Sequence, residues 1–223
     1  MSLGKPRRRA YIYPMAAPNT AENDPDAGLR DRLADAVVAE SAFDGFSRAA
    51  LAAAAGKLEL PRGEADRLFP GGPTQILSWL SERADRHTVE DMEKTGVAAL
   101  KVRDRIRSAV RLRLEKHGGE RESVRRALSL LSLPSNAGLA LKLLYRTVDA
   151  LWYAAGDTSA DFNFYTKRAI LAGVYSSTLL YWLNDRSPGH EATWGFLDRR
   201  IDDVMKFEKL KARVKAGPAR KAR

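Results

Sequence analysis

Apolar side chains recur three or four positions apart along most of this chain, with polar residues between them. Between residues 97 and 116, for example, Ile106, Val110 and Leu114 share one helical face, while arginines and lysines occupy the other. No run alternates with the period of two that a strand requires. The pattern predicts an all-α fold of about nine helices, over residues 26–43, 47–55, 61–69, 73–94, 97–116, 120–132, 136–154, 160–184 and 188–213.

Prolines, glycines and short polar residues mark the ends of these helices. Ser47 is placed to cap the second helix, which we expect to stop at Gly56. Pro61 and Pro73 suit the first turns of the third and fourth helices. Four prolines within the first 25 residues oppose a helix there. We therefore expect an extended or disordered basic leader over 1–27, a helix-turn-helix-like unit over 28–95, a helical bundle over 96–214 and a basic tail over 215–223.

Residues 152–168 form the most unusual segment, because aromatic, acidic and basic side chains gather there at a break between two helices. Gly156 is suited to end the seventh helix, and Thr158 with Asp161 forms a near capping box for the eighth. Capping does not account for the aromatic side chains, which suggest a partner surface or the rim of a pocket. The uncharged stretch 169–183 is apolar nearly all round. Such a helix lies in a core, at a dimer seam or beside a ligand cavity.

The net charge of +10 is concentrated at the two ends of the chain. Residues 1–10 carry +4 and residues 204–223 carry +7, which leaves about −1 for the body between them. Such tails are either solvated ends or attach to an anionic membrane surface or a nucleic acid. Residues 21–70 carry a net −4, whereas a DNA reader must neutralise phosphates. DNA binding through the helix-turn-helix-like unit is therefore disfavoured.

The residue combinations of several common active sites are missing from the sequence. It has no cysteine, and its three histidines are far apart, with none in a zinc-binding spacing. It has no Gly-rich phosphate loop and no nucleophile beside a base, so we expect neither an enzyme nor a metal site. The longest uncharged apolar run has 15 residues, fewer than the roughly 20 that span a bilayer. These features indicate a soluble intracellular protein.

Five stretches of the chain are long and specific enough to suggest a family. They are LFPGGP (68–73), IRSAVRLRLE (106–115), RALSLLSLPSN (126–136), VDALWYAAGDTSADFNFYTKRAILAGVYSSTLLYWL (148–183) and TWGFLDRRIDDVMKFEK (193–209). In these stretches the chain resembles the Coq-nine family, the lipid-binding accessory proteins of ubiquinone (coenzyme Q) biosynthesis. Residues 50–72 also resemble the DNA-reading unit of the TetR repressor family. The resemblance implies a TetR-repressor-like fold, a homodimer, and carboxyl-terminal helices that enclose a lipid-sized cavity.

The resemblance also implies a ligand and a partner. The ligand is a prenylated quinone or a phospholipid, and the partner is the di-iron hydroxylase that acts on demethoxyubiquinone. The family's docking positions match Asp149, Leu151, Trp152, Asp157, Asp161, Phe164, Tyr165 and Arg168. At Phe164 the family usually shows tryptophan, so the indole N–H donor is lost here. For the lining of a lipid cavity formed by the seventh to ninth helices we expect Trp152, Leu171, Val174, Tyr175, Thr178, Leu179 and Trp182.

Membrane contact is expected to differ from that of eukaryotic members, which carry a further amphipathic carboxyl-terminal helix. Here an anionic membrane surface would meet the basic tail and a narrow stripe made of Phe207, Leu210, Lys211 and Val214. Such contact is weak and sensitive to salt. The sequence shows no mitochondrial-type leader, which suggests a bacterial relative that is cytoplasmic and peripheral to the inner membrane.

The sequence thus leads to a hypothesis and two alternatives. The hypothesis is a non-catalytic accessory protein, with no cofactor beyond a bound lipid, that holds or presents a prenylated quinone intermediate from the membrane to the hydroxylase. One alternative is a ligand-responsive TetR-type repressor that binds DNA through Arg62 and Arg67. The other is a structural interaction protein with a solid core.

Overall fold

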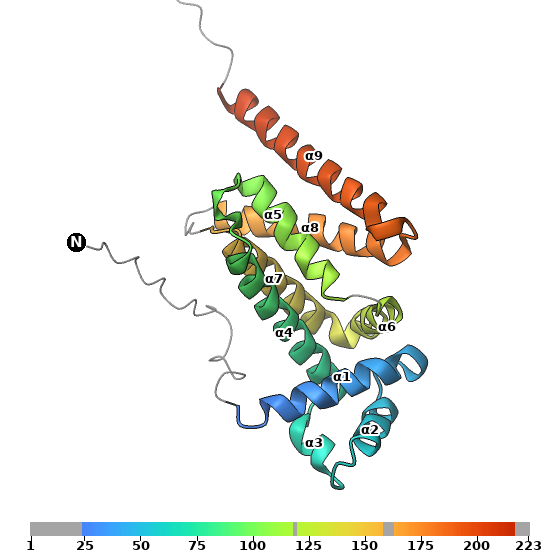
Figure 1. Ribbon diagram of the computed structural model, residues 1–223. Helices are drawn as coiled ribbons and strands as arrows, with labels where there is room; N and C mark the ends of the chain where they lie inside the picture. The colour runs from blue at the N-terminus through green and yellow to red at the C-terminus, as the bar shows by residue number, and fades with distance from the viewer. Residues whose placement is uncertain (1–23, 118–119, 158–162, 217–223) are drawn as a thin grey trace, which may run out of the picture.

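The computed structural model describes residues 24–117, 120–157 and 163–216, and within these ranges it contains nine α-helices and no strand (Figure 1). The helices are α1 (Ala27–Asp44), α2 (Arg48–Lys57), α3 (Glu64–Leu68), α4 (Pro73–Lys94), α5 (Val102–Glu115), α6 (Arg121–Leu131), α7 (Ala137–Ala154), α8 (Asn163–Asn184) and α9 (Glu191–Ala216). Three 3-10 turns, η1 (Val97–Ala99), η2 (Pro134–Asn136) and η3 (Pro188–His190), precede α5, α7 and α9. The predicted all-α fold is confirmed.

Local chemistry explains where the helices begin and where the predicted ends were wrong. The Ser47 side chain caps α2 by accepting a hydrogen bond from the N–H of Ala50. However, α2 continues through Gly56, because this glycine does not adopt the left-handed backbone that ends a helix. The third helix starts later than predicted. Gly63 has a φ of +84°, a left-handed conformation that prevents α3 from extending back to Pro61.

The predicted fifth helix is divided in two. The turn η1 ends at Ala99, and the backbone of Leu100 and Lys101 is extended before α5 begins. Most of the predicted leader (1–27) and of the predicted tail (215–223) lies outside the described residues. Helix α9 itself extends to Ala216, three residues beyond its predicted end.

Helix α4 connects two groups of helices. In Figure 1, α1, α2 and α3 lie together at one end, and α4 runs from there alongside α7 towards α5 and α8. Helix α6 packs against α1 and also against α7 and α8, so it bridges the two groups. Helix α9 crosses the opposite end, packed against α8 and α5.

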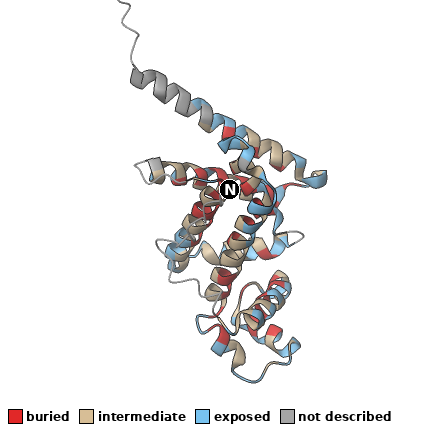
Figure 2. Cartoon of the chain, turned by 60° about the vertical axis from the view of Figure 1, so that its left-hand side comes forward, coloured by how far each residue is buried: buried red, intermediate tan, exposed pale blue. Residues whose placement is uncertain are grey.

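Two buried apolar clusters correspond to these two groups. One cluster includes Leu33, Phe69 and Ile76, and it joins α1, α2, α3 and the first turns of α4. The other includes Val110 and Leu151, and it joins α5, α7, α8 and α9 to the end of α4. Figure 2 shows buried positions along the facing sides of the helices and exposed positions on their outer sides. This is the arrangement that the helical periodicity of the sequence predicts.

Candidate functional site

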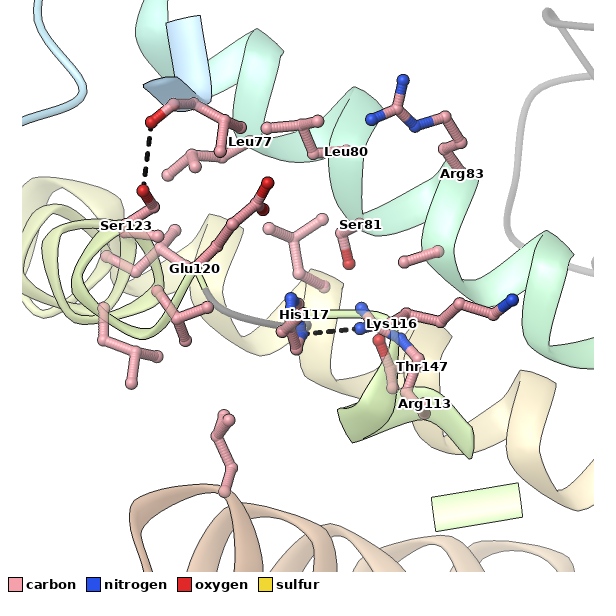
Figure 3. A pocket seen from close by; sticks show the side chains of 18 of the residues that line it. Leu77, Leu80, Ser81, Arg83, Arg113, Lys116, His117, Glu120, Ser123 and Thr147 are labelled. Atoms are coloured by element: carbon pink, nitrogen blue, oxygen red, sulfur yellow. Dashed lines mark hydrogen bonds between the residues drawn. The ribbon is translucent and has the colours of Figure 1, made fainter. Parts of the chain in front are cut away.

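A cavity of about 880 Å³ lies at the junction of the two clusters, between α4, α6, α7 and α8, with residues of α1 and α5 at its sides (Figure 3). Small-molecule sites typically have volumes of about 300–1,000 Å³. Much of the wall is apolar. Its apolar side chains include Leu80, Val124, Leu128, Leu143, Leu144 and Leu179.

A buried network of polar side chains forms part of the cavity wall. Arg113 of α5 is 3% exposed, and its Nε donates a hydrogen bond to Oδ1 of Asp85 in α4 over 2.7 Å. The hydroxyl of Thr147 in α7 donates to the same carboxylate, 2.9 and 3.1 Å from its two oxygens. The Nη1 atom of Arg113 lies 2.8 Å from Nε2 of His117 (Figure 3). One network therefore joins α4, α5 and α7 beside the cavity.

Burial sets the protonation states in this network. Burial and, as the smaller cause, the neighbouring Arg113 cation together lower the pKa of His117 to about 3. The neutral ring accepts at Nε2 because a guanidinium can only donate, and Nδ1 then carries the ring proton. Burial also raises the pKa of the Tyr175 hydroxyl, which stays protonated. Burial raises the pKa of Asp85 as well, while Arg113 and Thr147 act in the opposite direction.

The other cations that line the cavity are also paired with carboxylates. Arg83 of α4 lies 3.0 Å from Asp31 and forms a second ion pair with Asp35, both in α1. The Asp35 side chain is 61% exposed, so this part of the cavity reaches solvent. Lys116 forms an ion pair with Asp91. Each of the three basic residues that line the cavity, Arg83, Arg113 and Lys116, is therefore compensated by at least one carboxylate.

The predicted lipid-lining residues divide into two sets. Tyr175 and Leu179 line the cavity, one helical turn apart on α8. The remaining five do not line it and pack between helices instead: Trp152, Leu171, Val174, Thr178 and Trp182. Among the side chains that the structure describes, none from α9 lines this cavity, which is surrounded by α1 and α4–α8 rather than by the seventh to ninth helices. Helix α8 therefore meets the cavity on one face, through Tyr175 and Leu179, and the core on another, through residues such as Leu171 and Trp182.

Three of the predicted docking residues are buried and have a structural role. Leu151 belongs to the core. Arg168 of α8 donates from Nε to Oδ1 of Asp149 in α7 over 2.6 Å, and its Nη1 lies 3.7 Å from Asp157. The Arg168 guanidinium also lies 3.2 Å from the centre of the Phe164 ring. These contacts join α8 to α7, so Asp149, Leu151 and Arg168 can affect a partner only by shaping the surface.

An aromatic surface remains at the same corner. Tyr165 is 70% exposed, and its ring meets that of Phe164 edge to face at 5.2 Å. Trp152, which was predicted for both sites, donates its indole N–H to the carbonyl of Lys167 over 3.1 Å. Asp161 lies outside the described residues. The predicted membrane-contact residues lie on α9, and their side chains are outside the described part: Phe207, Leu210, Lys211 and Val214.

The helix-turn-helix-like unit holds several basic residues in ion pairs. Arg67 of α3 lies 2.7 Å from Glu64 and 2.7 Å from Asp26. Arg48 of α2 lies 3.4 Å from Asp66. These pairs reduce the positive charge available to phosphates. Helix α3, which takes the position of the recognition helix in a helix-turn-helix unit, is also only five residues long.

Two further properties concern the described residues as a whole. Among them, no group of three or more histidine, aspartate or glutamate side chains is arranged to hold a metal ion. No individual helix in the described ranges has the length and hydropathy for crossing a membrane, although Arg121–Leu131 and Pro134–Ala154, bent by 92°, meet both criteria as a pair.

The polar network was not predicted, although the sequence holds a signal for it. Arg113 follows Val110 by three positions, which places a cation on the inward face of α5. His117 follows Arg113 by four positions and lies on the same side. A charged residue on an apolar helical face requires a buried partner, but the sequence does not identify Asp85 as that partner.

In comparisons with known proteins, this chain is similar to COQ9 proteins. The profile of the COQ9 family matches residues 137–208. The chain is 39% identical over 178 residues to "Ubiquinone biosynthesis protein COQ9, mitochondrial" of Rattus norvegicus, covering 77% of this chain and 57% of that protein. Identity to the Homo sapiens protein of the same name is 36% over 194 residues, covering 84% of this chain and 61% of that protein. For "COQ9-B, mitochondrial" of Xenopus laevis the identity is 33%, covering 85% of this chain and 67% of that protein.

The chain thus spans about 60% of the length of the rat and human relatives. Among solved structures, a TetR transcriptional regulator from Nitrosomonas europaea matches with a TM-score of 0.62 and 20% identity. The match covers 78% of this chain and 97% of that chain. It confirms the predicted TetR-like fold, and at this identity it shows the fold alone.

Proposed function

The chain belongs to the COQ9 family, and from this membership we propose that it serves ubiquinone biosynthesis as a non-catalytic protein that binds a prenylated quinone intermediate or another lipid. The observation that carries the proposal is the 880 Å³ cavity, which is lined both by apolar side chains, chiefly leucines, and by polar ones such as Arg113, His117 and Thr147. A ligand with a long apolar tail and a polar head fits this division of the wall. Burial of the tail supplies the affinity, at about 0.8 kcal/mol for each methylene removed from water.

Organic extraction of the purified protein followed by mass spectrometry tests this proposal. We expect a prenylated aromatic compound or a phospholipid in the extract. Ala140→Trp fills the cavity wall at α7, so this variant should yield much less lipid. Ala169→Trp is the matched control, because Ala169 is exposed on α8 and does not line the cavity. Wild-type protein that is repeatedly empty, or equal yields from both variants, would contradict the proposal.

Presentation of the intermediate to the demethoxyubiquinone di-iron hydroxylase is the second part of the proposed function. It is supported by the exposed aromatic surface at the α7–α8 corner, where Tyr165 projects beside Phe164. Exposed aromatic side chains are common anchors in protein interfaces. In a pull-down with the purified hydroxylase, Tyr165→Ala should weaken retention, while Leu141→Ala, an exposed apolar residue on α7, should not. Equal retention of both variants would remove this part of the proposal.

A homodimer is also part of the proposed function. Tyr181 of α8 is 38% exposed, and its ring stacks on that of Phe196 of α9 with ring centres 4.6 Å apart. These two rings form an aromatic surface shared by α8 and α9, which a second copy can cover. Sedimentation velocity should show a dimer for the wild type and a shift towards monomer for Tyr181→Glu. A wild-type monomer at all concentrations would rule out the dimer.

The alternative function, a ligand-responsive repressor, draws its support from the TetR-like fold. The ion pairs of Arg67 and the net charge of −4 over residues 21–70 oppose it. Fluorescence anisotropy with duplex DNA at moderate salt should show no sequence-specific binding. Tight specific binding that is lost in Arg62→Ala and Arg67→Ala would favour the repressor instead.

A further inference from the structure

Hydrogen-bond donors are left over at the polar wall of the cavity. Of the five N–H groups of Arg113, one from Nε is used by Asp85 and one from Nη1 by His117. The other three have no partner among the residues that the structure describes. The Tyr175 hydroxyl also has no hydrogen-bond partner within the described ranges. Because Tyr175 is 6% exposed and lines the cavity, the cavity is where a partner for this hydroxyl has to come from.

These donors belong to one cavity. Arg113, His117 and Tyr175 all line it, and the Arg113 cation opposes the rise in the pKa of the Tyr175 hydroxyl. The neutral His117 ring adds a third donor through its Nδ1–H, since its Nε2 faces Arg113. Burying donors without acceptors is costly, so a ligand that brings acceptor oxygens to this wall is stabilised there.

The same wall offers no surplus positive charge. The guanidinium of Arg113 is compensated by Asp85, and the side chains of both residues are 4% exposed. Of the other two cations that line the cavity, Arg83 is paired with carboxylates of α1 and Lys116 with Asp91. An anionic head group would have to leave water without gaining an uncompensated cation, which is unfavourable in a buried site.

We propose that Arg113, His117 and Tyr175 form a recognition subsite that selects an uncharged ring carrying acceptor oxygens, such as a quinone, over an anionic lipid head. This inference rests on the proposed lipid-binding function and specifies which of its two ligand classes the cavity takes. The quinone carbonyl accepts from the Arg113 and Tyr175 donors, while the tail lies along the leucines of α6, α7 and α8. A phosphate lacks a cation to pair with at this wall.

Three probes with the same decyl tail separate the contributions of head and tail. They are decyl-1,4-benzoquinone, decylbenzene, which has no acceptor, and decyl phosphate, which is anionic. Affinities for the full chain are measured by calorimetry at concentrations below micelle formation. We expect the quinone to bind most tightly, because its tail is buried as in decylbenzene and its carbonyls gain hydrogen bonds. Decyl phosphate should bind more weakly than the quinone.

Tyr175→Phe removes only the hydroxyl and keeps the ring. Since one hydrogen bond is worth about 1 kcal/mol, we expect roughly a fivefold loss of affinity for the benzoquinone and no loss for decylbenzene. Tyr165→Phe is the matched control, because this tyrosine of α8 is exposed and away from the cavity lining. It should change neither affinity.

The outcomes also distinguish the selectivity from the proposed function. If decyl phosphate binds as tightly as the benzoquinone, or if Tyr175→Phe lowers both affinities equally, the selectivity is wrong while lipid binding stands. If none of the three probes binds the wild-type protein, both proposals fail together.

Discussion

Replacing Arg113 by methionine should strongly destabilise the protein, because the substitution leaves a buried carboxylate without its cation. Asp85 keeps only the Thr147 hydroxyl as a donor, and its side chain is 4% exposed. Removing one partner of a buried ion pair costs about 3–5 kcal/mol. For a chain of this size each kcal/mol lowers Tm by about 2–4 °C, so we expect a decrease of roughly 6–20 °C.

The compensating double variant distinguishes loss of charge balance from loss of packing. Asp85→Asn combined with Arg113→Met removes both charges and preserves the acceptor for Thr147. Its free energy of unfolding should lie within about 1 kcal/mol of the wild-type value, because replacing a whole buried pair is often neutral. The variants are compared by urea unfolding at pH 8, with circular dichroism as the signal.

The pH dependence of the single variant supplies a second check. Burial already raises the pKa of Asp85, and loss of Arg113 raises it further. Protonation of Asp85 then relieves the variant, so its deficit relative to wild type should shrink as the pH falls from 8 to 5. Wild-type stability for Arg113→Met at pH 8, or a double variant as unstable as the sum of the two single variants, would refute the reasoning.

Three further predictions concern stability. His117 has a pKa of about 3 in the folded protein and an ordinary value of 6.5. Below pH 6.5 the free energy of unfolding of the wild type should therefore fall by about 1.4 kcal/mol per pH unit relative to that of His117→Asn. Equal pH profiles of the two proteins in urea titrations would contradict this. Gly156→Ala should lower stability by about 1–2 kcal/mol, because Gly156 has a φ of +79° and a Cβ there would lie 2.7 Å from Nη1 of Arg105; an unchanged Tm would argue against this geometry. Arg168→Met should lower Tm markedly, because it removes the ion-pair partner of the buried Asp149 carboxylate on α7. Tyr165→Ala changes an exposed residue and should shift Tm by about 2 °C or less. Equal Tm changes for the two variants would show that Arg168 has no structural role.

The bounds of the helices could be predicted where local chemistry sets them. Helix α4 begins at Pro73 and ends at Lys94, as the sequence predicts. Ser47 caps α2, also as expected. The break before α5 could not be predicted, because the apolar spacing from Val97 onwards is compatible with one continuous helix. Backbone conformations at single residues such as Lys101 depend on tertiary packing.

The candidate site was predictable only in part, because a cavity is defined by contacts between helices. The sequence identified α8 as a helix that faces a ligand or a core, and Tyr175 and Leu179 do line the cavity. Since residues 169–183 of α8 are apolar nearly all round, their periodicity does not tell which face meets the cavity and which face meets the core. Trp182 was therefore assigned to the lining, although it packs in the core.

Arg168 was interpreted as a surface residue for a similar reason. Its position beside exposed aromatic side chains suggested docking, but the buried Asp149, nineteen positions earlier, draws it into the protein. A long-range ion pair of this kind leaves no periodic signal in the sequence. Arg113, by contrast, lies on the apolar face of α5, so its position in the periodic pattern marks it as buried.

Photo-crosslinking tests the central claim most directly, because it shows where the ligand lies. The probe is a benzoquinone whose apolar tail carries a diazirine, bound to the full chain, irradiated and followed by peptide mass spectrometry. The account predicts labelled peptides from α6 (Arg121–Leu131) and α8 (Asn163–Asn184), with labelling suppressed by Ala140→Trp and retained by Ala169→Trp. Labelling that avoids the α6 peptide, or that Ala140→Trp leaves unchanged, would contradict the assignment of this cavity as the quinone site.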